Sequence, residues 1–189
     1  MFVLLQAGRV EGGEFSYEDI LKEYPGVLIK LKCFASIARE VQPFLTKFQT
    51  DCPMVPFLRS ALESMLRSLL SRIVKQDNLS ASSSTVRLMA IDIIDESVLL
   101  PLTNVHMGFA AEEHARQLIS GKKSSQLQCR DLRAQCRDFV VALVVKLNEK
   151  SPLSFPLVRS ASCLDPRKMA VSSGKEECMK LMKCVCAAF

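Results

Sequence analysis

Thiols and imidazoles are the side chains of this sequence best suited to holding a metal ion or acting as nucleophiles. A structural zinc site needs cysteine or histidine pairs that converge on one ion, typically two residues apart within each pair. The eight cysteines form no CxxC pair, and neither His106 nor His114 has a cysteine nearby. Cys184 and Cys186 lie in a segment with helical periodicity, where residues two apart point in different directions. We therefore expect no metal, no cofactor and no Cys–His dyad.

Carboxylates and glycines indicate no better-defined chemistry. Asp92, Asp95 and Glu96 would attract Mg²⁺, but a two-metal site needs carboxylates brought together from separate elements of a rigid scaffold. No sheet that would bring them together is predicted, so solvated surface acids are the favoured interpretation. The seven glycines form neither GxGxxG nor GxxxxGK[ST], which excludes the usual phosphate loops. We predict no catalytic residue in this chain.

The best cationic cluster lies in the stretch KKSSQLQCRDLRAQCR. Its basic residues are Lys122, Lys123, Arg130, Arg133 and Arg137. The three arginines follow helical steps of three and four, so their guanidinium groups would track a phosphate backbone. No aromatic residue is interleaved for base stacking, and cationic edges beside a buried stripe are common. These five residues are the predicted nucleic-acid contacts, with an ordinary solvated helix face as the alternative.

An acid, a cysteine, a proline and three cations meet in LVRSASCLDPRKM, residues 157–169. This mixture is compatible with a reactive centre or with a structural connector. If the segment is a connector, we expect Asp165 to cap a turn started by Pro166 and Arg167 to pair with a carboxylate.

Composition places these residues in one globular unit with a real core. The chain has 189 residues, of which 49% are apolar and 24% charged, and its net charge of +5 is spread over 25 basic and 20 acidic residues. The opening MFVLLQAGRV lacks the basic region of a secretory signal. The longest apolar run, residues 139–145, is far shorter than the ~20 residues of a membrane span. We expect reduced cysteines, no membrane or small-molecule partner, and a nuclear or cytoplasmic location.

The predicted fold class is all-α, an irregular bundle of about five to seven helices. Residues 1–26 form an N-terminal segment with a short helix capped by Ser16, and residues 27–79 form a helical hairpin turned at TDCPMVPFL. Apolar residues on the first hairpin helix recur in steps of three and four, and the hairpin would bury this stripe: Val27, Leu31, Phe34, Ala38, Val41, Leu45 and Phe48. Pro43 predicts a kink or break near Gln42.

The second hairpin helix presents a broad apolar face between Leu58 and Val74. Its charged residues are expected to stay hydrated: Arg59, Glu63, Arg67 and Lys75. Residues 80–105 are a predicted linker or extended segment, in which VRLMAIDII, residues 86–94, is either a short strand or a helical turn.

Residues 106–189 are predicted to be the C-terminal helical part of the same domain, with helices over 110–119 and about 125–148. The helical periodicity still continues at the last residues, so we expect the chain to be a truncated piece of a longer protein.

Two stretches of the sequence resemble transposase-like proteins of the hAT superfamily. They are VQPFLTKFQTDCPMVPFLRSALESMLRSLLSRIVK, residues 41–75, and CRDFVVALVVKLNEKSPLSFPLVRSASCLDPRKM, residues 136–169. LDPR, residues 164–167, is similar to the LDPRFK element that such proteins carry late in their helical region, but Lys168 and Met169 follow here, so the aromatic of that element is missing. The resemblance covers roughly residues 27–189.

The resemblance implies an all-helical insertion that, in the family, interrupts an RNase H-like core whose three acids cut and join DNA with divalent metal. No segment matches the first two catalytic acids, the BED-type zinc finger or the C-terminal dimerisation segment. The matching part is the insertion and the segment by which the chain leaves it. Asp165 is therefore not assigned a catalytic role, and LDPR is interpreted as a structural joint.

The expected function is that of a non-catalytic helical fragment which contributes to DNA binding or subunit assembly, with self-association through apolar helix faces. Two alternatives stay open. The chain is part of an active DNA transposase whose catalytic acids lie outside it, or it is a protein-interaction bundle without a nucleic-acid role.

Overall fold

The computed structural model describes residues 24–51, 53–121, 125–170 and 175–186, so the predicted Ser16-capped helix lies outside the described residues. The α-helices in this part of the chain are α3 (Pro25–Phe48), α4 (Val55–Ser71), α5 (Gln76–Ala81), α6 (Thr85–Met89), α7 (Phe109–Ser120), α8 (Gln126–Lys150), α9 (Pro156–Ser160), α10 (Pro166–Met169) and α11 (Lys175–Cys186). Three short 3₁₀ helices join them: η1 (Leu102–Asn104), η2 (Pro152–Ser154) and η3 (Ala161–Leu164). The described residues form no strand beyond an isolated bridge between Val74 and Leu99, which confirms the all-α prediction.

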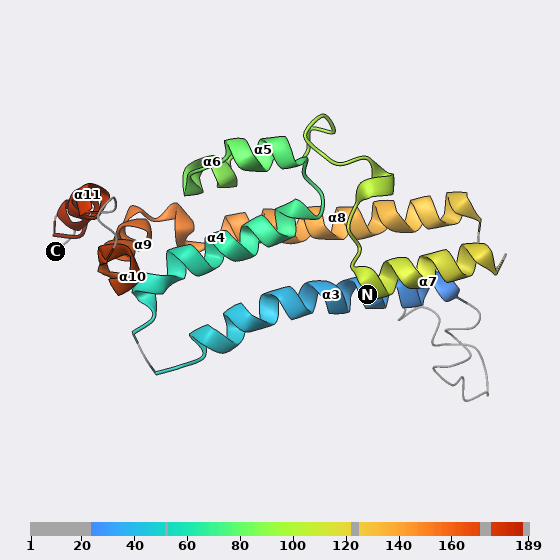
Figure 1. Cartoon of the computed structure of the whole chain (residues 1–189), viewed down its shortest axis with the longest axis horizontal. Coiled ribbons are helices and arrows are strands. Elements are labelled where there is room, and N and C mark those ends of the chain that lie inside the picture. The colour runs from blue at the N-terminus through green and yellow to red at the C-terminus, as the bar shows by residue number, and fades with distance from the viewer. Residues whose placement is uncertain (1–23, 52, 122–124, 171–174, 187–189) are drawn as a thin grey trace.

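Three long helices, α3, α4 and α8, lie side by side and give the molecule its elongated shape (Figure 1). The chain runs in one direction along α3 and α8 and in the opposite direction along α4. Helix α7 packs along α3, the short helices α5 and α6 cover α4, and α9 to α11 gather at the end where α4 begins. The hairpin of α3 and α4 is thus completed by α8 from the second half of the chain.

The core lies where the three long helices meet. The apolar face predicted for α4 is buried there, including Leu62, Met65, Leu66, Leu69 and Ile73. Helix α3 contributes Ile29, Cys33 and Ile37, and α8 contributes Cys136, Val140 and Val144. Helices α7 and α8 occupy the positions predicted from periodicity within two residues at each end.

The stripe predicted to be buried on α3 is not the line of residues that faces the core. Leu31, Phe34 and Leu45 are 49%, 38% and 50% exposed, whereas Ile29 and Ile37 are 1% and 4% exposed. Helix α3 is apolar over a wide arc, so several lines of residues satisfy a helical period equally well. The contacts with α4, α7 and α8 select one line for burial and leave the predicted stripe largely uncovered.

Helix α3 continues through Pro43, so of the two predicted outcomes, a kink or a break near Gln42, the break does not occur. Proline removes the hydrogen bond to the carbonyl of Arg39, four residues earlier. Both residues are exposed, so water can satisfy that carbonyl.

The segment predicted as a linker, residues 80–105, begins in the last turn of α5 and contains α6 and η1, and of the two alternatives for residues 86–94 the helical turn is the one found at 85–89. Ser84 caps α6 by accepting a hydrogen bond from the backbone N–H of Arg87 at 3.3 Å. These short helices cover charged side chains of α4 that we expected to be hydrated. Arg67 donates hydrogen bonds to the carbonyls of Leu79 and Ser82.

Arg59 and Glu63 on α4 are likewise half-buried instead of hydrated. Arg59 Nε lies 3.2 Å from Glu63 Oε1 and 3.0 Å from the hydroxyl of Thr85, the first residue of α6. Arg59 Nη1 also reaches the hydroxyl of Ser162 in η3 at 3.4 Å. Two short elements from distant parts of the sequence are therefore held on α4 through one arginine.

The LDPR segment is a structural joint, as predicted. Asp165 is the N-cap of α10 and accepts a hydrogen bond from the backbone N–H of Arg167 at 3.0 Å. The Arg167 guanidinium donates to the same carboxylate from Nε at 3.1 Å and from Nη2 at 3.0 Å, and it also lies 5.0 Å from the centroid of the Phe57 ring. These hydrogen bonds lower the pKa of Asp165. The joint is thereby fixed against the start of α4.

Candidate functional site

The predicted phosphate-binding row on α8 is divided by the fold. Lys122 and Lys123 lie outside the described residues. Arg133 directs Nη1 at the carbonyls of Thr103, at 3.4 Å, and Val105, at 3.1 Å. It therefore ties the loop around η1 to α8, and these donors are not directed at solvent.

The other two arginines of the row, Arg137 and Arg130, also lie in different surroundings. The Arg137 side chain is 18% exposed and lies 3.9 Å from Glu96 and 3.6 Å from Asp138, so nearby carboxylates offset its charge. Arg130 is exposed, and no hydrogen bond or ion pair joins it to another described residue. Of the three predicted arginines, Arg130 is the one whose guanidinium is open to an external phosphate.

The acids between α6 and η1 serve as turn-forming residues. Asp92 accepts a hydrogen bond from the backbone N–H of Ile94 at 2.9 Å, and Asp95 accepts from the N–H and the hydroxyl of Ser97 at 2.8 and 2.6 Å. The bonds from Ser97 lower the pKa of Asp95. Within the described ranges, no three His, Cys, Asp or Glu side chains come together as a metal-binding group.

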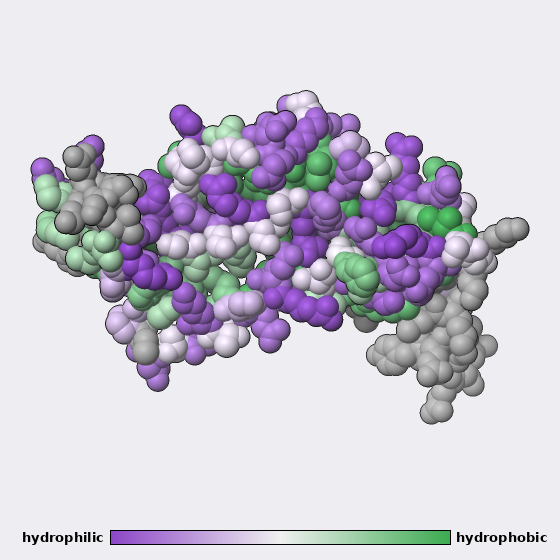
Figure 2. Space-filling view, in the orientation of Figure 1, coloured by the Kyte–Doolittle hydropathy of each residue, from purple (hydrophilic) through white to green (hydrophobic). Residues whose placement is uncertain are grey.

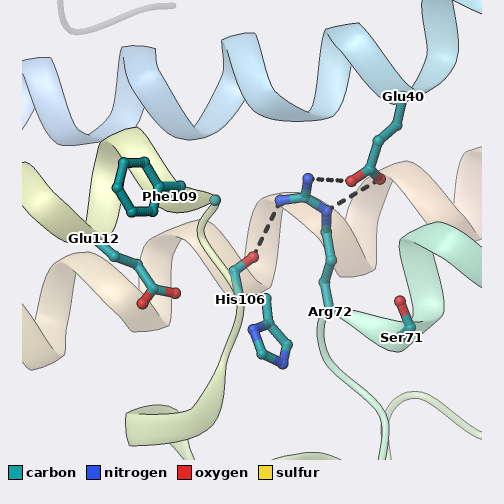
Figure 3. A pocket seen from close by; sticks show the side chains of 7 residues that line it. Glu40, Ser71, Arg72, His106, Phe109 and Glu112 are labelled. Atoms are coloured by element: carbon teal, nitrogen blue, oxygen red, sulfur yellow. Dashed lines mark hydrogen bonds and ion pairs between the residues drawn. The ribbon is translucent and has the colours of Figure 1, made fainter.

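A polar cavity of about 360 Å³ lies between α3, the end of α4 and the start of α7 (Figure 3). We call it the Arg72 pocket, and its lining residues are Glu40, Ser71, Arg72, His106, Gly108, Phe109 and Glu112. One signal of this pocket is visible in the sequence. Arg72, the residue that follows α4, stands between the apolar pairs Leu69–Leu70 and Ile73–Val74, and a charged residue within such an apolar run needs a buried partner.

Arg72 is 6% exposed and joins all three walls of the pocket. Its Nε and Nη2 pair with the carboxylate of Glu40, with an Nε–Oε2 distance of 3.2 Å. Nη2 also donates to the Ser36 hydroxyl at 2.8 Å, and Nη1 donates to the His106 carbonyl at 3.1 Å. Figure 3 shows the bonds from Arg72 to Glu40 and to the His106 carbonyl, which link α3 to the chain before α7, while the His106 ring points away from the guanidinium. These bonds of Arg72 fasten α3 to the end of α4 and to the chain before α7.

Gly108 allows the chain to pass close to this cluster. It has a positive φ of 93°, and a Cβ atom at this position would lie 2.3 Å from the Ser36 hydroxyl oxygen. Only glycine fits both the backbone angle and the space. The tight approach places the His106 carbonyl within reach of Arg72.

An exposed apolar surface is the other feature with functional potential. We call Leu31, Phe34, Ala38 and Leu45 the α3 stripe, and all four are exposed. The Phe139 ring of α8, itself 38% exposed, packs beside it with its centroid 4.3 Å from that of Phe34. By contrast, hydrophilic side chains predominate on the face of the molecule seen in Figure 2, and its apolar groups form small patches.

Comparison of the chain with protein-family models, with curated proteins and with solved structures found no match. In the part of the chain that the structure describes, every helix is too short or too polar to cross a lipid bilayer.

Proposed function

We propose that this chain is a non-catalytic helical module, of the kind suggested by its resemblance to the insertion region of hAT-type transposases, and that it works by subunit assembly. The proposal depends on one observation: four apolar residues of one line, Leu31, Phe34, Ala38 and Leu45, stay exposed on α3 although the helix is packed on three neighbours. Contiguous exposed apolar surface of this kind is characteristic of sites that bind another protein.

A second copy of the chain is the proposed occupant of the α3 stripe. The α3 stripe contains no charged residue and includes the ring of Phe34, and the Phe139 ring of α8 packs beside it. Charge depletion and aromatic enrichment are the marks of an interface core. Each copy carries a net charge of +5, so an uncharged face is where two copies can meet without like-charge repulsion.

The length of the stripe suits a pair of helices. Leu31 and Leu45 are fourteen positions apart, which corresponds to about 21 Å along the axis at the rise of an α-helix. Two such stripes in a two-fold arrangement would form one helix–helix seam, and closed two-fold dimers are the commonest homo-oligomers.

Sedimentation velocity over a concentration series tests the proposal. The unaltered chain should sediment as a dimer at micromolar concentration, and Leu45→Glu should shift it to monomer, because a charge would be buried in the seam. Leu127→Glu is the matched control, since Leu127 is an exposed leucine at the start of α8 and does not belong to the stripe. A chain that remains monomeric at the highest concentration, or equal effects of both substitutions, would reject assembly through α3.

Contact with DNA is the second candidate, supported by the exposed guanidinium of Arg130. Phosphate contacts make affinity fall steeply with salt. Binding to duplex DNA should therefore be measured over a salt series, where Arg130→Gln should reduce the salt dependence. Arg133→Gln is the comparison, because it should weaken the fold around η1 more than DNA binding. Absence of binding even at low salt would remove this candidate.

A further inference from the structure

Exposed apolar side chains gather at the end of the molecule where α9, η3, α10 and α11 lie. Helix α11 packs against α9, η3 and α10, and η3 packs against α4. Six large apolar side chains among the described residues of this end are 39% to 64% exposed: Phe155, Leu157, Leu164, Met169, Met179 and Met182. We call these six residues the α9–α11 surface, and Figure 2 shows light green side chains beside purple ones at this end. Clustered apolar residues on a surface, unlike single ones, mark a site of interaction.

The charge of this end is positive. Lys180 and Lys183 are exposed on α11, Lys168 lies on α10, and no ion pair joins these lysines to another described residue. Asp165, the acid among the described side chains of this end, is 1% exposed and serves as the N-cap of α10. In the sequence from 155 to 186, six basic and three acidic residues give a net charge of +3, compared with +5 for the whole chain. Apolar side chains and unpaired cations therefore lie together on this end.

From these two features we propose that the α9–α11 surface binds an acidic amphipathic segment of another protein. In such a segment, leucine and phenylalanine recur at helical spacing and aspartate or glutamate fills the positions between them. The apolar side chains of the segment pack on Met179, Met182 and their neighbours, because the unbranched methionine side chain adapts to partners of different shape. The carboxylates then face Lys180 and Lys183, which gives the charge complementarity that selects one partner over another. This site is separate from the α3 stripe and does not depend on subunit assembly.

An acidic protein segment fits this surface better than a nucleic acid or a membrane does. A phosphate backbone would satisfy the lysines but would leave the apolar side chains in water, and five of the six have no ring on which a base could stack. A helix that binds the membrane interface carries its apolar face along one amphipathic helix, whereas this surface is assembled from elements of 4 to 12 residues. An irregular surface with separate apolar contacts is suited to the side chains of a protein partner.

Fluorescence anisotropy with three labelled peptides tests the site on the whole chain. The first peptide has about 16 residues, or four helical turns, with leucine or phenylalanine at helical spacing and glutamate elsewhere. The second replaces every glutamate by lysine, and the third replaces every leucine and phenylalanine by serine. At about 0.1 M salt the first peptide should bind with a dissociation constant in the micromolar range, and the other two should bind at least about tenfold more weakly.

A pair of double variants locates the binding on α11. Met182→Ser with Lys183→Glu removes one apolar contact and reverses one charge, so the affinity for the first peptide should fall at least about tenfold. Ile119→Ser with Arg116→Glu is the matched control, because Ile119 and Met182 are 37% and 39% exposed and both variants change the net charge equally. Its two residues lie on α7, at the other end of the molecule (Figure 1), and its affinity should equal that of the unaltered chain.

The proposal fails if the unaltered chain does not bind the first peptide, or if the lysine or the serine peptide binds as tightly. It also fails if both double variants lose affinity equally. Two other occupants have their own results. Co-sedimentation with phosphatidylserine–phosphatidylcholine vesicles, without peptide binding, would make the surface a lipid site. A change of sedimentation coefficient in the α11 variant, again without peptide binding, would mean that a second copy covers it. The three peptides decide the matter on the unaltered chain even if a variant does not fold.

Discussion

Replacing Arg72 by methionine tests the physical interpretation of the Arg72 pocket. Methionine keeps most of the aliphatic volume but removes the guanidinium, and with it the pairing to Glu40 and the bonds to the Ser36 hydroxyl and the His106 carbonyl. Hydrogen bonds to charged groups contribute about 1.5–3 kcal/mol each, and breaking a buried ion pair costs about 3–5 kcal/mol.

The expected loss lies at the lower end of that range. The Glu40 side chain is 32% exposed, so its carboxylate regains water once Arg72 is absent. The half-buried His106 carbonyl and Ser36 hydroxyl each lose a donor. We expect the free energy of unfolding to fall by about 3 kcal/mol. The chain before α7 should loosen first, since Arg72 holds it against α3.

Urea unfolding followed by circular dichroism, at pH 7 and one protein concentration, measures this free energy. Arg116→Met is the control, because Arg116 is 64% exposed and pairs with Glu113 on the surface of α7. Its loss should change stability by less than about 0.5 kcal/mol. A loss below about 1 kcal/mol for Arg72→Met, with an unchanged m-value, would refute the assignment of Arg72 as the fastening residue.

A double-mutant cycle separates the ion pair from the other contacts. Glu40→Gln alone leaves a buried guanidinium without its counter-charge, so it should destabilise the chain by about 2 kcal/mol. If the two side chains act as a pair, the double variant should lose at least about 1 kcal/mol less than the sum of the single variants.

Three further substitutions have expected outcomes that thermal and urea unfolding can check. Gly108→Ala should destabilise the chain by about 2 kcal/mol, because its Cβ would strike the Ser36 hydroxyl at a positive φ; an unchanged melting temperature would contradict the tight approach. Ser125→Ala should lose about 1 kcal/mol, since the Ser125 hydroxyl accepts from the third backbone N–H of α8 in a capping box. Asp165→Ala should lose about 1 kcal/mol through its cap. Hydrogen bonds from Arg167 lower the folded-state pKa of Asp165, so its contribution is present above the unfolded-state pKa and is lost as the pH falls through the folded-state pKa. Stability measured from pH 6 to pH 2 should therefore decline less in Asp165→Ala than in the unaltered chain.

The sequence alone determined the helical content and most helix positions. Apolar residues at helical spacing located α4, α7 and α8, and the buried face of α4 followed from the same pattern. The LDPR joint was also predictable, because the capping by Asp165 and the turn at Pro166 are interactions among neighbouring residues. Local features of this kind depend on residues that are neighbours in the sequence and not on tertiary contacts.

Only the tertiary structure decided which surfaces are buried and which side chains meet. Periodicity states which residues share a face of a helix, but not what that face contacts, so the exposed stripe of α3 was assigned to the core. The arginines of α8 follow one helical row in the sequence, yet Arg133 and Arg137 lie against η1 and Glu96 while Arg130 faces solvent. Such contacts depend on how whole helices pack, which no local spacing encodes.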